Sequence, residues 1–253
     1  AWSEGGKQLG FEDPRGQLFL EYVRIVNLKK PKFFVIENVQ GILEDKHKQS
    51  LAFIISSLQS IGYSIKYELL NAVDYKIPQD RFRVFFVGIR NDLQNTFVFP
   101  NAMPGKKVTL REAIGDIIEK PRFFNEERVM SEHSTRKNHD VYTGSYDAKY
   151  MARNRVRSWN EQSFTIQAQA RNEPQHPQAP KMTYVNPNVR IFAKGYEHLY
   201  RRLSVRECAR IQTFPDSFVF FYTDIKDGYK MVGNAVPPRL AYALAVQVRK
   251  ALL

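Results

Sequence analysis

Phe33-Phe34-Val35-Ile36-Glu37-Asn38-Val39 is the stretch of sequence that decides the fold. Its first four residues form an uninterrupted apolar run, which is typical of a short buried strand. Residues at helical spacing lie on either side of the run, and two further apolar segments follow. The helical residues before the run are Leu18, Tyr22, Ile25 and Val26, and those after it are Leu51, Ile54, Ile55 and Leu58. The two further apolar segments are 63–70 and 84–89, which we predict to be strands. Because helices and strands alternate, we predict a mainly parallel sheet covered on both faces.

Glu37 and Asn38 lie at the carboxyl end of the first predicted strand. Open α/β sheets place their ligand-binding and catalytic groups at this end. A carboxylate there can hold or donate a proton. A glutamate that merely caps the next turn is the alternative interpretation of this tripeptide taken alone.

Two arginines in Gln79-x-Arg81-x-Arg83 come directly before the strand predicted over 84–89. Alternate residues of an extended segment point to the same side, so we expect both guanidinium groups together. Such a pair suits a phosphate or a base carbonyl. Solvated surface arginines are the alternative.

The pattern changes from about residue 91, where prolines interrupt the chain and regular periodicity fades. Residues 120–200 are polar, rich in Arg, Asn, Gln, Tyr and Pro. We therefore predict a separate, smaller domain with irregular β structure in this region.

Two capping boxes predict where helices begin, Thr109-x-x-Glu112 and Ser204-x-x-Glu207. The chain then ends in a helix with a continuous apolar stripe. The residues of this stripe are Leu240, Leu244, Val248 and Leu252.

Arginines recur between residues 201 and 210, where structural pairing and phosphate contact both remain open. Cys208 shares the inward face of this predicted helix with Val205 and Ala209. We therefore expect a core residue and not a nucleophile.

Gly233-Asn234-Ala235-Val236-Pro237-Pro238 is a turn of small residues that leads into the last helix, with Pro fitting its opening turn. A simple helix-entry loop is one interpretation. Exposed backbone groups and an asparagine at such a turn could equally hold a small polar ligand.

Composition narrows the possible partners and compartments. The excess of 38 Lys and Arg over 26 Asp and Glu gives a net charge of +12, so a polyanion is the first partner to consider. One cysteine excludes an internal disulfide and a cysteine-rich metal site, which suits a reducing cytoplasm. No apolar run approaches the roughly 18 to 20 residues that span a bilayer, and no signal peptide opens the chain. We expect a cytoplasmic protein without metal, and the start at Ala1 in a glycine-containing loop suggests the middle of a larger protein.

Taken in order, these segments resemble the later motifs of the bacterial DNA (cytosine-5)-methyltransferase family, over most of the chain. Residues 3–6 and 13–19 resemble the mobile catalytic loop of that family and its following helix. The resemblance implies part of a Rossmann-like sheet that binds S-adenosylmethionine, joined to a smaller, irregular β-rich target-recognition domain. On this basis 1–104 is the C-terminal part of the catalytic α/β domain, 105–200 the target-recognition domain, and 201–253 a return segment whose last helix packs on the catalytic domain.

The resemblance also implies roles for the motif residues. In this family Glu37, with Asn38, would stabilise protonation at N3 of the target cytosine. Arg83, with Arg81, would hold the base oxygen or a nearby phosphate. The residues expected to line the S-adenosylmethionine pocket are Leu18, Asn234, Ala235 and Val236.

The variable region has a likeness of its own, to the recognition domains of modification methylases that read GGCC in double-stranded DNA. The segments that carry it are Arg153-Asn154-Arg155-Val156-Arg157, Trp159-Asn160-Glu161, Phe164-Thr165-Ile166-Gln167 and His176-Pro177-Gln178-Ala179-Pro180. It implies guanine contacts for Arg153, Arg155 and Arg171, and arginine is the natural bidentate partner of guanine. Phosphate contact is the alternative for each. Ser3 and Arg202 are the two further residues expected on DNA.

The departures from the family are as informative as the matches. The glycine-bearing cofactor strand and the Pro-Cys-Gln nucleophile motif are both absent from the sequence. We therefore expect a partner, either the N-terminal part of one longer chain or a separate subunit. A DNA-binding module without catalysis and a methyltransferase acting on transfer RNA are the competing functions. The long arginine-rich recognition region favours DNA over transfer RNA.

Overall fold

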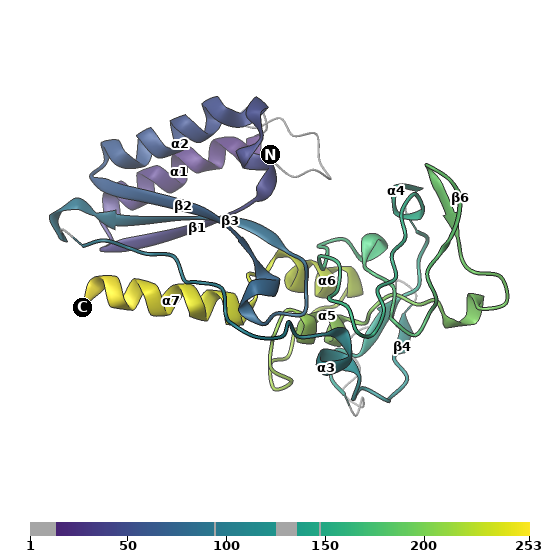
Figure 1. Ribbon diagram of the computed structural model, residues 1–253. Helices are drawn as coiled ribbons and strands as arrows, with labels where there is room; N and C mark the ends of the chain where they lie inside the picture. The colour runs from purple at the N-terminus through teal and green to yellow at the C-terminus, as the bar shows by residue number, and fades with distance from the viewer. Residues whose placement is uncertain (1–13, 94, 125–135, 147) are drawn as a thin grey trace. The chain divides into compact units, whose positions relative to one another are not determined.

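The computed structural model describes residues 14–93, 95–124, 136–146 and 148–253, which divide into two compact units (Figure 1). Of the described residues, those from 14 to 71 together with those within 82–102 and 241–253 form the first unit, and those within 72–81 and 103–240 form the second. Each unit has a buried hydrophobic core of its own.

The first unit is a three-stranded sheet with helices. In chain order its elements are α1 (Pro14–Lys29), β1 (Phe33–Val39), the 3-10 turns η2 (Gln40–Leu43) and η3 (Asp45–His47), α2 (Lys48–Ser60), β2 (Tyr63–Asn71), β3 (Phe82–Arg90), η5 (Asn91–Leu93) and most of α7 (Pro238–Leu252). Figure 1 shows α1 and α2 over one face of the sheet and α7 along the other, so the expected cover on both faces is confirmed.

The expected parallel pairing of the sheet is wrong for the strands that the structure describes. The strand order is β1-β3-β2, and β3 pairs antiparallel with both neighbours. Because β1 and β2 are each antiparallel to β3, they run in the same direction, as the intervening helix α2 requires. The connection from β2 to β3, residues 72–81, is too short for a helical crossover, so β3 returns antiparallel and inserts between them.

The core of the first unit lies between the sheet and the helices α1 and α2. Ile54 and Leu58 of α2 are buried as predicted. On α1 the helix is confirmed but its inward stripe is partly different, since Tyr22 and Val26 pack inward whereas Leu18 is 65% exposed. The inward set is Phe19, Tyr22, Val23 and Val26.

The second unit combines short helices with two-stranded sheets, in keeping with the predicted irregular β structure. Its elements are η4 (Ala72–Tyr75), α3 (Leu110–Ile114), β4 (Arg122–Phe124), β5 (Asp140–Tyr142), α4 (Ala148–Met151), η6 (Ala170–Asn172), β6 (Thr183–Asn186), β7 (Val189–Ile191), η7 (Glu197–Leu199), α5 (Val205–Ile211) and α6 (Ile225–Asn234). Strands β4 and β5 pair parallel, and β6 and β7 form an antiparallel hairpin.

Both predicted capping boxes are present. Thr109 and Ser204 each accept a hydrogen bond from the backbone N–H three residues later, and Glu112 and Glu207 reach back to the cap N–H. The predicted stripe of the last helix is also buried at three positions, Leu240, Leu244 and Val248. Helix α6, with Asp224 as its N-cap, was not predicted.

The position of residues 201–240 differs from the expected return to the catalytic part. Helices α5 and α6 share one hydrophobic core with α3 and with Ile166, all inside the second unit. Val205, Cys208 and Ala209 are fully buried in this core, so the inward face predicted for α5 is confirmed. Only the part of α7 from residue 241 onward belongs to the first unit.

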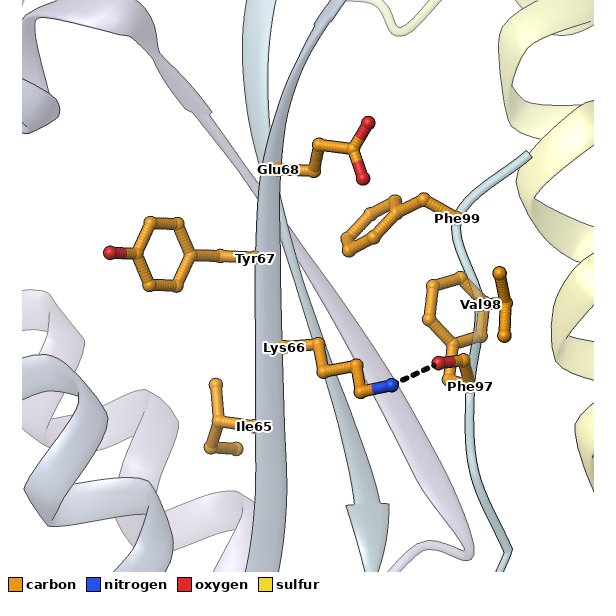
Figure 2. A pocket seen from close by; sticks show the side chains of 7 residues that line it. All are labelled: Ile65, Lys66, Tyr67, Glu68, Phe97, Val98 and Phe99. Atoms are coloured by element: carbon orange, nitrogen blue, oxygen red, sulfur yellow. Dashed lines mark hydrogen bonds between the residues drawn. The ribbon is translucent and has the colours of Figure 1, made fainter. Parts of the chain in front are cut away.

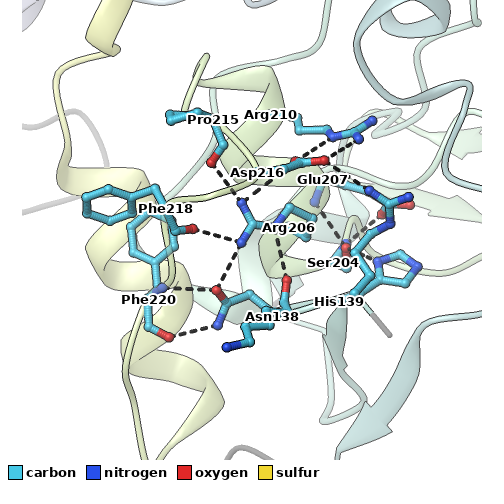
Figure 3. Close-up of polar contacts among 12 residues, drawn as sticks. Asn138, His139, Ser204, Arg206, Glu207, Arg210, Pro215, Asp216, Phe218 and Phe220 are labelled. Atoms are coloured by element: carbon cyan, nitrogen blue, oxygen red, sulfur yellow. Dashed lines mark hydrogen bonds and ion pairs between the residues drawn. The ribbon is translucent and has the colours of Figure 1, made fainter. Parts of the chain in front are cut away.

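A buried arginine anchors α5 to the loop that follows it (Figure 3). Arg206 is 1% exposed and donates to the carbonyls of Lys137, Phe218 and Pro215, at 3.0, 2.8 and 3.3 Å. Arg210 pairs with Asp216. For these two arginines the structure therefore favours pairing within the protein over contact with phosphate.

Candidate functional site

Glu37 and Arg83 form an ion pair at the carboxyl end of β1. The Nε atom of Arg83 lies 2.7 Å from Oε1 of Glu37, with side-chain exposures of 17% and 27%. The antiparallel register pairs Val39 with Arg83 and Glu37 with Phe85, which places Glu37 and Arg83 diagonally across two strands on the same face. Burial lowers the pKa of the Arg83 guanidinium, and the Glu37 carboxylate opposes that shift.

Asn38 shapes the end of β1. Its Oδ1 atom accepts a hydrogen bond from the backbone N–H of Val39 at 2.9 Å. The side chain is half-buried and turned back on its own backbone. In this geometry Asn38 orients the chain beside Glu37.

Arg81 does not share the surroundings of Arg83, which corrects the expectation that both guanidinium groups point to one side. Arg81 is 1% exposed and belongs to the second unit. It donates to the carbonyls of Ile166, Gly233 and Ala235, at 3.2, 2.8 and 3.2 Å. Its guanidinium is therefore hydrogen-bonded to backbone carbonyls, and the structure does not support a contact with a base or a phosphate.

The turn expected to hold the cofactor follows the end of α6. Asn234 is the last residue of this helix and is exposed, whereas Ala235 and Val236 are half-buried. A Cβ atom at Gly233 would lie 2.1 Å from the carbonyl oxygen of Gln167, so only glycine fits there. The turn presents one amide beside apolar groups, which suits a small ligand with polar and apolar parts.

Leu18, the fourth residue expected at the cofactor, is 65% exposed on α1. Its role stays a prediction. Ser3 lies outside the described residues, as do the rest of the segment 3–6 and Asp13, which belong to the stretch that resembles the catalytic loop and its following helix.

Arg202 has a structural role, which corrects its expected contact with DNA. Its side chain is 2% exposed and donates to the carbonyls of Tyr142 and Ser145, at 2.9 and 3.0 Å. The guanidinium also lies 3.9 Å from the ring centroid of Tyr146. Because it is enclosed by aromatic rings and carbonyls, it has no exposed face to offer a phosphate.

The three arginines expected on guanine differ in their surroundings. Arg153 and Arg171 are exposed. Arg155 is half-buried and stacks on Tyr150, 4.8 Å from the ring centroid. Gln175 donates to the Tyr150 hydroxyl at 2.7 Å and so fixes the ring beneath Arg155.

Cys208 is buried, as expected. Its Sγ atom lies 3.6 Å from Oε2 of Glu173, and burial together with that carboxyl raises the pKa of the thiol well above its usual range. A thiol in this state is a poor nucleophile. The prediction that Cys208 is a core residue is confirmed.

The burial of three polar residues in this region was not predicted from the sequence. Gln79 is fully buried and donates to Gln212 at 2.9 Å, although the two are 133 residues apart in sequence. Glu173 is also fully buried, which raises the pKa of its carboxyl. A glutamine or glutamate carries no pattern that marks it as buried, so no sequence signal could have found them.

The first unit also has an open groove of about 410 Å³ along β2 (Figure 2). Lys66 and Glu68 point to one side of the strand and Tyr67 to the other, and Lys66 donates to the carbonyl of Phe97 at 2.8 Å. None of the residues predicted to act on DNA or cofactor lines this groove.

Within the described ranges there is also no group of three possible metal ligands and no helix long and apolar enough to cross a membrane.

A profile of the C-5 cytosine-specific DNA methylase family matches residues 1–250. The chain belongs to this family. The type II methyltransferase M.MthTI of Methanothermobacter thermautotrophicus is 50% identical over 252 residues, covering 100% of this chain and 76% of the relative. M.FnuDI of Fusobacterium nucleatum is 46% identical over 255 residues, covering 100% and 74%.

Solved structures agree on the fold. A putative DNA modification methyltransferase encoded within an E. coli prophage superposes with a TM-score of 0.67 at 21% identity, covering 96% of this chain and 76% of that one. The Dnmt2 methyltransferase of S. pombe gives 0.54 at 18% identity, covering 96% and 74%. The fold is that of the S-adenosylmethionine-dependent methyltransferases, and the family resemblance found in the sequence is confirmed. The two relatives are type II methyltransferases, and S-adenosylmethionine is the cofactor of the family to which the chain belongs.

Proposed function

We propose that the chain carries the base-activating and DNA-reading parts of an enzyme that methylates C5 of a cytosine in GGCC-containing duplex DNA. The observation that carries the proposal is the ion pair between Glu37 and Arg83 at the end of β1. A cytosine protonated at N3 presents a donor beside the O2 acceptor. A carboxylate next to a guanidinium is the matching pair, since the first accepts and the second donates.

The roles of the two side chains follow from this match. Glu37 favours protonation at N3, which makes C6 a better electrophile for an attacking nucleophile. Arg83 donates to O2 and stabilises negative charge that develops on the ring. The target base must leave the stack to reach them, because C5 and C6 are enclosed inside a duplex.

The nucleophile has to come from outside these 253 residues. Cys208 is the only cysteine of the sequence, and it is buried with a raised pKa. M.MthTI carries the whole match within one polypeptide. We therefore infer a single longer enzyme, in preference to separate subunits, as the source of the attacking thiolate.

The remaining predicted residues divide between cofactor and DNA. Asn234, Ala235 and Val236 are the residues of the second unit assigned to S-adenosylmethionine, and Leu18 is the residue of the first unit assigned to it. The bound cofactor supplies the methyl group, carried on a positively charged sulfur. Guanine contact is assigned to three arginines of the second unit, Arg153, Arg155 and Arg171, of which two are exposed.

Methyl transfer from tritium-labelled S-adenosylmethionine tests the proposal. The full-length enzyme should label a GGCC duplex, and should label poorly both a duplex with 7-deazaguanine at one guanine and an RNA duplex of the same sequence. Sequence-specific binding without any labelling would instead support a DNA-binding module, and preferential labelling of RNA a transfer-RNA enzyme. Residues 1–253 alone should transfer no methyl group, and measurable transfer by them would contradict the argument about the nucleophile.

A further inference from the structure

The turn after α6 is held by side chains from two distant segments. Arg81 donates to the carbonyls of Gly233 and Ala235, at 2.8 and 3.2 Å. Gln212 donates to the carbonyl of Val232 at 2.8 Å. The last carbonyls of a helix have no partner within it, and a cation near them is favourable. These two side chains therefore determine how the backbone leaves α6.

The same guanidinium reaches the segment 163–167. Arg81 donates to the carbonyl of Ile166 at 3.2 Å, and the N–H of Ile166 donates to Gln79 at 2.9 Å. Gln79 in turn donates to Gln212 at 2.9 Å. The side chains of Gln79, Arg81 and Gln212 are at most 1% exposed. Water cannot replace any of these bonds without opening the core. The three side chains therefore hold the segment 163–167 and the turn after α6 in one arrangement relative to each other.

The two segments also touch directly. Gly233 packs so closely on the backbone of Gln167 and Ala168 that a Cβ atom would overlap both. The exposed Arg171 follows on η6, the next element of the chain. A movement of this segment when DNA binds would therefore be transmitted to the turn through a contact that has no free space.

We propose that Arg81 couples DNA recognition to cofactor binding. The inference rests on the proposed function, which places a guanine at Arg171 and S-adenosylmethionine at the turn 234–236. One guanidinium is shared by the carbonyls of both segments, so a displacement of Ile166 changes the bonds to Gly233 and Ala235. Arg81 is in this sense a positioning residue. By reciprocity, the cofactor strengthens DNA binding by the same factor as DNA strengthens cofactor binding.

The test measures that factor in the full-length enzyme. The dissociation constant of S-adenosylhomocysteine is determined by calorimetry, first without DNA and then with a GGCC duplex. If GGCC is not the recognition site, a plasmid fragment that the enzyme methylates takes the place of the duplex. We expect the duplex to tighten binding about fivefold or more in the wild-type enzyme. In Arg81→Lys the factor should fall to about one, because lysine cannot reach three carbonyls at once. Gln212→Met removes the bonds that Gln212 donates to Val232 and Ala235 and the bond that it accepts from Gln79, but leaves those of Arg81, and should reduce the factor in part.

Arg206→Lys is the matched control. Arg206 is likewise buried on three backbone carbonyls, but these belong to other loops. It should lower thermal stability and leave the factor unchanged. A wild-type factor of one, a normal factor in Arg81→Lys, or an equal loss in Arg206→Lys would each overturn the coupling. Loss of labelling at GGCC alone would count against the proposed function and not against the coupling.

Discussion

His176 should make the stability of the second unit depend on pH by an amount that its surroundings determine. The imidazole is 5% exposed and lies edge-on to Trp159, with ring centroids 5.2 Å apart. Burial is the main cause that lowers the pKa of His176 from 6.5 to about 4. The Glu207 carboxylate, 3.6 Å from Nε2, opposes the shift.

The sign follows from which state takes up the proton. Below about pH 6.5 the unfolded chain protonates His176, whereas the folded chain does so only near pH 4. Stability is therefore complete above about pH 6.5 and decreases as the pH falls toward 4. Lowering the pKa of His176 from 6.5 to about 4 corresponds to about 3 kcal/mol of unfolding free energy across this window.

Urea unfolding followed by the fluorescence of Trp159 measures this loss, with Trp2→Phe removing the only other tryptophan. His176→Gln keeps an acceptor for the N–H of Gln178 but cannot be protonated. We expect the contribution of His176 to disappear, so that the stability difference between the wild-type protein and His176→Gln changes by about 3 kcal/mol between about pH 7 and about pH 4. His198→Gln, which alters an exposed histidine, is the control that should keep the wild-type slope. A wild-type slope in His176→Gln would refute the reasoning.

Four further substitutions test single residues of the two units. Glu37→Gln in the full-length enzyme should slow single-turnover methyl transfer about 100-fold or more with little change in DNA affinity, because an amide cannot stabilise the protonated ring; a normal rate would remove Glu37 from the mechanism. Arg155→Ala should reduce the preference for GGCC in competition binding by about 1–3 kcal/mol. Arg202→Ala should instead lower the unfolding temperature, because it removes charged hydrogen bonds worth about 1.5–3 kcal/mol each. Equal weakening on all duplexes would make Arg155 a backbone contact. Gly233→Ala should destabilise the protein in thermal unfolding, since its Cβ would meet the Gln167 carbonyl at 2.1 Å; an unchanged midpoint would show that α6 can shift.

The sequence by itself determined the features that depend on neighbours along the chain. The capping boxes of Thr109 and Ser204 formed as predicted, because residues three apart meet at the start of any helix. The burial of Cys208 followed from the apolar face that it shares with Val205. The family was identified from the order of short motifs, which needs no knowledge of how the segments meet.

Only the tertiary structure decided the strand order and the groups that the arginines bind. Strand β3 inserts antiparallel because its pairing depends on partners far away in sequence, which periodicity does not record. Arg81 and Arg83 are two residues apart, yet the first binds carbonyls 85 and 152 residues away and the second binds Glu37. A guanidinium suits a phosphate, a base, a carboxylate or a carbonyl equally well. Which of these groups it binds depends on the segments that folding brings beside it. For this reason the predicted contact of Arg202 with DNA was wrong.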